Sequence, residues 1–358
     1  MAASLQERLV RDIREDGPIS VADYMTRCLH DPLGGYYATR PSLGEGGDFI
    51  TAPLISQMFG ELIGLWALET WQALGAPDHF HLIEIGPGDG TLMADALRAA
   101  SLSPAFLEAA RLTLIEPSAP LRAIQARRLG ALEPVPHWVP SLDAIEPDRP
   151  VILIANEVLD CMPARQFLRR DGRWFERRVG VDEAGALVFG LSAPTAGFVR
   201  PPFPVEDGQI VEISEAQARF AGALAGLIAR TSGAALLIDY GREHPGPGDT
   251  FQGLIRHQKV DPLHRPGEAD LTVWADFPAV MEAALRGGVD VSGCVPQGAF
   301  LTRLGIRERA AALIGHHPAR APTIERQLAR LTAPDQMGEL FKAVALFSPR
   351  SLALPGFQ

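Results

Sequence analysis

The sequence predicts an α/β fold built on a doubly wound, Rossmann-like parallel sheet. Apolar runs of strand length alternate with helical patterns through the middle of the chain, and polar residues follow directly after several of these runs. Strands are predicted over residues 80–85, 111–116, 135–139, 151–155 and 234–239. The helices between them are predicted over residues 91–100, 121–128 and 216–230.

A helical extension is predicted before the sheet, over residues 1–75. Its first helix is indicated by Leu5, Leu9 and Ile13, which recur at helical spacing. A glycine-rich loop over 43–53 leads into a second, buried helix. Pro53 suits the first turn of that helix, and Thr51 is its expected N-cap. The sheet domain is expected to occupy residues 76–358.

Two insertions on the substrate side of the sheet are predicted, at about 165–213 and 241–331. The first carries a hairpin signal, because Asp171-Gly172 separates two strand-like runs. The second opens with a Gly-, Pro- and His-rich segment, 241–270, whose length is typical of a functional lid. A helical pattern follows, with Phe277, Val280, Met281 and Leu285 on one stripe. A buried strand is predicted at 340–347.

Composition narrows the classes of partner. A formal net charge of −10 argues against electrostatic binding to nucleic acid or anionic lipid. No apolar segment reaches the ~20 residues that span a bilayer, so no stable membrane insertion is expected. The N-terminus lacks a secretory apolar core, and its acids argue against a transit peptide, so the expected location is cytoplasmic. The three cysteines lie far apart in the sequence, and the histidines show no HExxH spacing, so no metal site is predicted.

Three alternate glycines follow the strand over 80–85. Glu84 precedes Gly86, Gly88 and Gly90, and a helix is predicted to begin directly after them. Such a turn lets a ligand approach the main chain closely, and the amides of the following helix face that ligand. The pattern predicts a nucleoside site, although a glycine-rich turn can also be a simple tight connection.

Glu116 ends the next strand and supports the nucleoside site. A dinucleotide fingerprint has glycines at its first, third and sixth positions. Here they stand at the first, third and fifth, and the turn with its two acids resembles that of class I S-adenosyl-L-methionine-dependent methyltransferases. The resemblance implies that Glu84 and the glycine backbone flank the amino-acid end and ribose of this cofactor, and that Glu116 accepts both ribose hydroxyls.

Further cofactor contacts follow from strand order and this resemblance. The residues expected beside the adenine are Pro117, Ser118, Ser141, Leu142 and Asp143. Asn156, at the end of the fourth strand, is also expected to contact the cofactor.

Candidates for the chemistry follow the fourth and fifth strands. In an open α/β sheet, ligands bind beyond the carboxyl ends of the strands. Asn156, Glu157 and Asp160 stand there, and so do Asp239 and Tyr240. The alternative is that the first group only caps a helix and holds loops, and that Tyr240 only plugs the sheet end.

Motifs spread over nearly the whole chain resemble the MidA family. They are Gly47-Asp48-Phe49-Ile50-Thr51-Ala52-Pro53, Glu84-Ile85-Gly86-Pro87-Gly88-Asp89-Gly90, Glu116-Pro117-Ser118, Asn156-Glu157-Val158-Leu159-Asp160, Asp239-Tyr240-Gly241, Asp261-Pro262-Leu263 and Ala269-Asp270-Leu271-Thr272. This family is similar to the mitochondrial complex I assembly factor that methylates an arginine of a core complex I subunit. The resemblance implies a protein-arginine N-methyltransferase with a protein substrate, and a role in complex I (NADH:quinone oxidoreductase) assembly.

An arginine acceptor needs carboxylates that orient its guanidinium. Glu157 and Asp160 are the predicted catalytic acids, with Asp48 and Asp239 in reserve. The chain departs from the family pattern at Leu54 and over 273–275.

Two other functions stay open. A nicotinamide-dependent oxidoreductase would also use an acid after the second strand, but the sixth-position glycine is missing. A non-catalytic assembly chaperone could bind S-adenosylmethionine without turnover.

Overall fold

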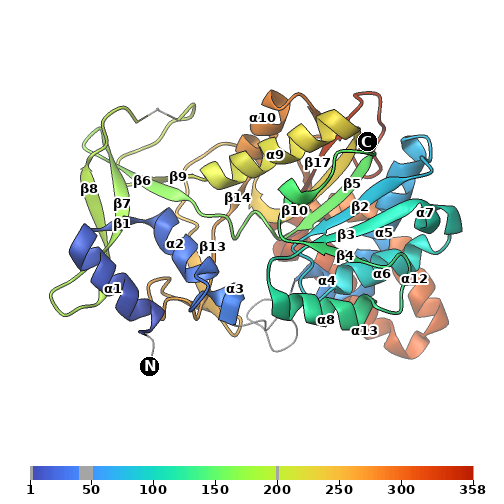
Figure 1. Ribbon diagram of the computed structural model, residues 1–358, viewed down its shortest axis with the longest axis horizontal. Coiled ribbons are helices and arrows are strands. Elements are labelled where there is room, and N and C mark those ends of the chain that lie inside the picture. Colours follow the sequence, from blue (N-terminus) through green and yellow to red (C-terminus); the bar gives the residue numbers. More distant parts are fainter. Residues whose placement is uncertain (1–2, 40–50, 199–200, 358) are drawn as a thin grey trace. The chain divides into compact units, whose positions relative to one another are not determined.

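The chain folds into two compact units in the computed structural model, which describes residues 3–39, 51–198 and 201–357 (Figure 1). The first unit combines Met1–Phe49, Leu159–Ala218 and His244–Pro278, and the second combines Ile50–Val158, Arg219–Glu243 and Ala279–Gln358. Each unit therefore draws on three separate stretches of sequence. The sequence-based division at residue 75 stays a prediction about domain boundaries.

The second unit is built on the predicted doubly wound sheet. Its strand order is β15-β17-β10-β5-β2-β3-β4. The parallel core consists of β4 (His137–Val139), β3 (Ala110–Ile115), β2 (Phe80–Ile85), β5 (Val151–Asn156) and β10 (Gly233–Arg242). All five predicted strands are confirmed within a few residues. The final predicted strand is β17 (Phe341–Ser348), which runs antiparallel to β10 and separates it from β15 (Asp290–Val291).

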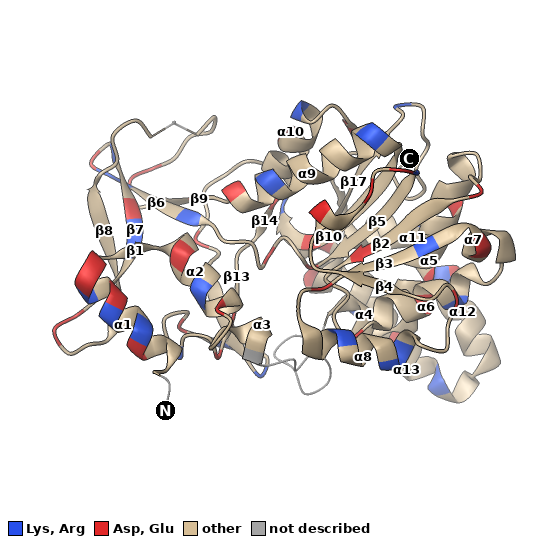
Figure 2. Cartoon of the chain, in the orientation of Figure 1, with Lys and Arg blue, Asp and Glu red and all other residues tan. Residues whose placement is uncertain are grey.

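Burial explains why these segments form a parallel sheet. Every residue of β2 is buried, and so are the first five of β5. Such continuous burial is typical of strands that are covered on both faces, as those of parallel sheets are. Neither strand carries Lys or Arg (Figure 2).

The helices of the second unit pack closely on one another and on the sheet. The three predicted helices are α6 (Thr91–Ala100), α8 (Ala119–Leu129) and α9 (Glu215–Thr231), and α7 (Pro104–Ala109) precedes β3. Helix α5 (Gln57–Ala73) approaches α6 at Gly64, where a Cβ atom would lie 2.3 Å from the carbonyl oxygen of Ala96. Only glycine permits that approach.

The buried helix predicted after Pro53 is two helices. Helix α4 (Ala52–Ile55) ends at Ser56, whose backbone is extended, and α5 begins at Gln57. The Ser56 hydroxyl accepts a hydrogen bond from the Met58 N–H at 3.3 Å, so it caps α5. Pro53 lies in the first turn of α4 as predicted, but Thr51 forms no side-chain cap.

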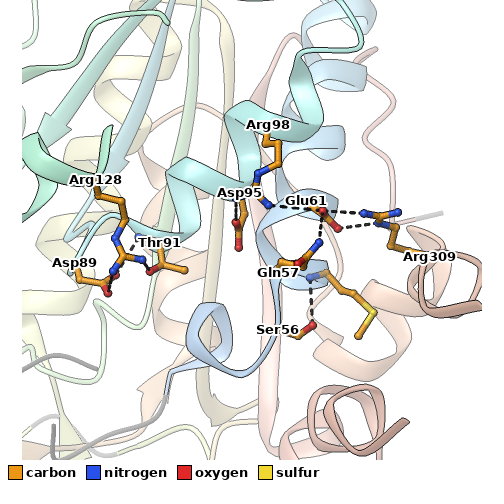
Figure 3. A network of polar contacts seen from close by, with 10 residues as sticks. Ser56, Gln57, Glu61, Asp89, Thr91, Asp95, Arg98, Arg128 and Arg309 are labelled. Carbon is orange, nitrogen blue, oxygen red and sulfur yellow. Dashed lines mark hydrogen bonds and ion pairs between the residues drawn. The ribbon is translucent and has the colours of Figure 1, made fainter. Parts of the chain in front are cut away.

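The C-terminal stretch is helical, as predicted. It comprises α10 (Phe277–Arg286), α11 (Gln297–Arg303), α12 (Ile306–His316) and α13 (Ala321–Thr332). The predicted apolar stripe on α10 is wrong at Leu285, which is exposed, whereas Val280 is buried. Helix α12 is tied to α5 by Arg309, which donates from Nε and Nη2 to the Glu61 carboxylate at 2.8 and 2.9 Å (Figure 3).

The first unit contains the N-terminal helices and an antiparallel sheet. Helices α1 (Leu5–Asp16) and α2 (Val21–His30) bury Leu5, Leu9 and Ile13 in one apolar cluster. The sheet is formed by β1 (Ile19–Ser20), β6 (Arg165–Arg170), β7 (Arg173–Val181), β8 (Leu187–Pro194) and β9 (Ile210–Ile213). Asp171 and Gly172 both have positive φ, at 49° and 70°, so the predicted hairpin turn is confirmed.

The segment over 241–270 is more ordered than the predicted loop. Strands β11 (Gln252–Ile255) and β12 (Gln258–Val260) form a three-stranded antiparallel sheet with β13 (Asp270–Thr272). Just before β11, the N–H groups of Thr250 and Phe251 donate to the Glu212 carboxylate at 2.9 and 3.1 Å, which fixes the backbone there. Within the described ranges, every helix is too short or too polar to span a bilayer.

Candidate active site

The order of the strands creates a binding edge in the second unit. Strand β2 lies between β3 and β5. The chain runs outward from β2 through β3 to β4, and the connection after β4 returns to β5 on the other side of β2. This is the topological switch point at which open α/β sheets bind ligands, beyond the carboxyl ends of the strands. The glycine turn, Glu116 and Asn156-Glu157 follow β2, β3 and β5 at this edge.

The glycine turn has the backbone that its sequence predicts. Gly86, Gly88 and Gly90 have φ values of 63°, 56° and 84°, a region that side chains disfavour. The Gly90 N–H donates to the Pro87 carbonyl at 2.8 Å and closes the turn. Helix α6 starts at Thr91, so its first amides lie beside the turn, where a ligand can approach the main chain.

Glu84 is buried just before this turn. Its side chain is 2% exposed, and its Oε2 atom has no hydrogen-bond partner among the described residues. Burial, and to a smaller extent the nearby charge of Asp89, raise the pKa of the Glu84 carboxyl to about 8. An unsatisfied buried carboxyl at a glycine turn indicates a polar ligand group there.

Replacing Glu84 with Gln is expected to stabilise the ligand-free protein, and more so as pH rises. Folded Glu84 keeps its proton up to a pKa of about 8, whereas an exposed Glu loses it near ~4.3. The folded state therefore binds more protons between these values, and linkage makes the wild-type free energy of unfolding fall as pH rises. Urea unfolding across this range should show a gain for Glu84→Gln that grows to at least about 1 kcal/mol. A gain that does not depend on pH, or one matched by exposed Glu108→Gln, would contradict this assignment.

Glu116 is the second buried acid at this edge. It is 5% exposed, and its Oε1 and Oε2 atoms accept hydrogen bonds from the Ser118 N–H at 2.8 Å and the Gln125 side chain at 3.3 Å. Burial raises the pKa of Glu116, while these two hydrogen bonds oppose the rise. Each carboxylate oxygen has lone pairs for a further donor, so Glu116 fits two neighbouring hydroxyl groups.

Gln125 is a residue of this site that the sequence reasoning missed. It lies on α8, is fully buried, and its Nε2 also donates to the Gly88 carbonyl at 2.8 Å. A glutamine on a helix is ordinarily a surface residue. The available signal was its position four residues from both Leu121 and Leu129, which places all three on the buried stripe of α8.

The predicted adenine contacts occupy the next strand ends. Pro117 and Ser118 directly follow β3, and Ser141, Leu142 and Asp143 form a tight turn after β4. Parallel pairing of β3 with β4, extended by the hydrogen bond from the Glu116 N–H to the Val139 carbonyl at 3.1 Å, brings both segments to one edge. Their contacts with adenine stay predictions.

Asn156 and Glu157 stand at the end of β5. Glu157 has a φ of 54°, unusual for a residue with a side chain, and its N–H donates to the Ile238 carbonyl at 2.8 Å. Its Oε1 atom accepts from the Asn156 amide at 3.0 Å and from the Ala52 N–H at 3.2 Å. Backbone strain with a side chain held in place is a pattern typical of functional sites.

Asp239 lies beside Glu157, because β10 pairs with β5. It is fully buried, and its Oδ1 atom accepts the Tyr240 N–H at 2.8 Å. Tyr240 packs edge-on against Phe341, with ring centroids 5.3 Å apart, so it does help to fill the end of the sheet. Of the four predicted catalytic acids, Glu157 and Asp239 are at this edge. Asp160 belongs to the first unit, where it is 7% exposed, and Asp48 lies outside the described residues.

Fold and site together define a class I methyltransferase that uses S-adenosylmethionine. This cofactor fits the residues present, since Glu116 can accept its two ribose hydroxyls, and Glu84 and the glycine turn offer a polar contact and a close backbone approach. Residues 62–295 match the family described as "Putative S-adenosyl-L-methionine-dependent methyltransferase". The chain belongs to this family.

Relatives match almost the whole chain. The Drosophila melanogaster protein arginine methyltransferase NDUFAF7 homolog is 36% identical, over 96% of this chain and 85% of that protein. Human protein arginine methyltransferase NDUFAF7 is 35% identical, over 96% and 83%. A solved Burkholderia thailandensis structure with bound S-adenosyl-homocysteine has a TM-score of 0.85 and 29% identity, over 99% of this chain and 94% of that one.

These relatives correct the prediction of cellular location. The Drosophila, zebrafish and human proteins are all named as mitochondrial. The cytoplasmic location expected from the N-terminal sequence is therefore wrong. The only sequence argument against a mitochondrial location is the presence of acidic residues near the N-terminus. Such residues bear on whether a segment resembles a transit peptide, and not on the compartment in which the folded protein acts.

Proposed function

We propose that this chain is a protein-arginine N-methyltransferase whose substrate is a complex I subunit, methylated during assembly of that complex. The main support is that relatives named as protein arginine methyltransferases match 96% of the chain. The edge of the sheet at β2 and β3 also has the features that S-adenosylmethionine requires. Support for the complex I subunit comes from the sequence motifs shared with the MidA family.

Methyl transfer mainly requires the protein to place the two reacting groups correctly. S-adenosylmethionine supplies a methyl group on a positively charged sulfur. A guanidinium nitrogen forms the new N–C bond, the C–S bond breaks with its electron pair going to sulfur, and the nitrogen gives up one proton. The main contribution of the protein is to hold nitrogen and methyl group in line and close together.

Glu157 is proposed to hold the guanidinium and to receive that proton. Arginine stays protonated at ordinary pH and its lone pairs are delocalised, so a carboxylate must orient one nitrogen. Support comes from the strained backbone of Glu157 and from the two N–H groups that fix its Oε1 atom. Asp239, at the end of the neighbouring strand β10, is proposed as a further acid of the acceptor site.

The proposal is tested by peptide mass mapping in cells. Complex I core subunits would be compared between cells that lack this protein and cells complemented with the wild-type chain or with Glu116→Ala. We expect methylated arginine only with the wild-type chain. Unmethylated arginines in all three, with complex I assembly restored by both chains, would contradict the enzyme and support a chaperone. A methyl group on another residue type would overturn arginine as the acceptor.

A further inference from the structure

One buried amide joins the two halves of the cofactor site. Gln125 Nε2 donates to the Gly88 carbonyl in the glycine turn, 2.8 Å away, and to the Glu116 carboxylate, 3.3 Å away. The Cα atom of Gln125 would also lie only 3.6 Å from a Cβ atom on Gly90. Helix α8 therefore contacts the turn after β2 and the acid after β3 through one side chain.

Trp138 fixes the orientation of this amide. Its indole Nε1–H donates to Gln125 Oε1 at 2.8 Å. An indole nitrogen is only a donor, so the atom facing it must be the amide oxygen. The amide NH₂ must then face Gly88 and Glu116, which both offer acceptors. The three contacts are consistent with one amide orientation only.

A second contact between α8 and the turn lies at the surface. Arg128, three residues after Gln125, pairs with Asp89 at 2.8 Å and also contacts Thr91 (Figure 3). Its side chain is 41% exposed, and an exposed ion pair contributes little. The hydrogen bond from Gln125 to the Gly88 carbonyl comes from a fully buried side chain that is shielded from water, so it is the stronger of the two contacts with the turn.

We propose that Gln125 is a positioning residue for the methyl donor, which holds the Glu116 carboxylate and the glycine turn in one fixed geometry. A carboxylate that must accept two hydroxyls gains from having its own orientation set before the ligand arrives. The Ser118 N–H holds one oxygen and Gln125 holds the other. The inference rests on the cofactor alone, so it stands or falls independently of arginine as the acceptor.

The test is a double-mutant cycle measured by calorimetric titration with S-adenosyl-homocysteine. Gln125→Met keeps the size of the side chain and removes its hydrogen bonds. We expect it to weaken binding at least about tenfold in the wild-type chain. In a Glu116→Gln background, which retains one acceptor oxygen, it should weaken binding no more than about twofold. Equal losses in both backgrounds, or no loss in the wild-type chain, would overturn the proposal.

Two more variants separate positioning from general stability. Gln297→Met makes the same change at another fully buried glutamine, on α11, whose Nε2 donates to the Leu331 carbonyl at 3.0 Å. It should lower the thermal stability and leave ligand affinity unchanged. Trp138→Phe removes only the contact that orients the amide, and should weaken binding about threefold, through Glu116. If Gln125→Met fails to fold, the Trp138→Phe cycle decides in the same way.

Discussion

Glu116→Ala is expected to weaken S-adenosylmethionine binding by about 100-fold or more, because it removes two charge-assisted hydrogen bonds to the ribose. Glu116 is buried and prepared for this role, with one protein donor on each oxygen. The loss of affinity is not expected to come from unfolding. Burial raises the pKa of Glu116, so the buried carboxylate is unfavourable in the ligand-free protein, and its removal takes that cost away. The folded state should therefore survive the change.

Calorimetric titration with S-adenosyl-homocysteine measures this effect directly. The matched control is Glu108→Ala, an exposed acid on α7 in the same unit. Wild-type affinity in Glu116→Ala would remove Glu116 from the site, and an equal loss in the control would mean that net charge, and not position, sets the affinity.

Glu157→Gln is expected to slow methyl transfer by about 10²–10⁴-fold while leaving cofactor affinity close to wild type. The amide keeps an oxygen that can accept the Ala52 N–H, so the local structure should persist. It cannot receive a proton or balance the charge of a guanidinium. A single-turnover assay with a protein acceptor measures the rate, and titration with S-adenosyl-homocysteine checks the binding.

Asp239→Asn is the comparison for Glu157. Asp239 is fully buried at the end of the neighbouring strand and accepts the N–H of Tyr240. If Glu157→Gln transfers methyl groups at the wild-type rate while Asp239→Asn does not, Asp239 replaces Glu157 as the proposed catalytic acid. If both variants weaken cofactor binding instead, these acids belong to the cofactor site.

The parallel core could be predicted from the sequence because its signals are local. A strand buried on both faces is rich in apolar residues, as β5 is over its first five residues and β2 is apart from His81 and Glu84. A turn that needs three left-handed residues needs glycines, and Gly86, Gly88 and Gly90 supply them. Parallel pairing then brings Glu84, Glu116 and Glu157 to one edge without further information.

Other features depend on contacts that are distant in sequence. Ser56 ends α4 and caps α5, but the apolar pattern continues across it and hides the break. The strands over 252–272 are three or four residues long, too short for a clear alternation. Gln125 is polar on a buried stripe, and its partners Gly88 and Trp138 come from other segments.

Strand order alone does not predict which residues bind the methyl acceptor. It places residues that directly follow a strand, such as Glu157, but not those further along the connection. Asp160 comes four residues after β5 ends and belongs to the other compact unit. A prediction based on strand ends therefore places residues that directly follow a strand, and becomes weaker with each residue further along the connection.

The most direct test of the central claim, a site for S-adenosylmethionine at the carboxyl edge of β2 and β3, is one calorimetric comparison on the intact chain. Wild type and Glu116→Ala would each be titrated with S-adenosyl-homocysteine and with NAD. The structure predicts that the wild-type chain binds S-adenosyl-homocysteine and not NAD, and that Glu116→Ala loses this binding. Binding of NAD alone, or binding of S-adenosyl-homocysteine that does not depend on Glu116, would contradict it.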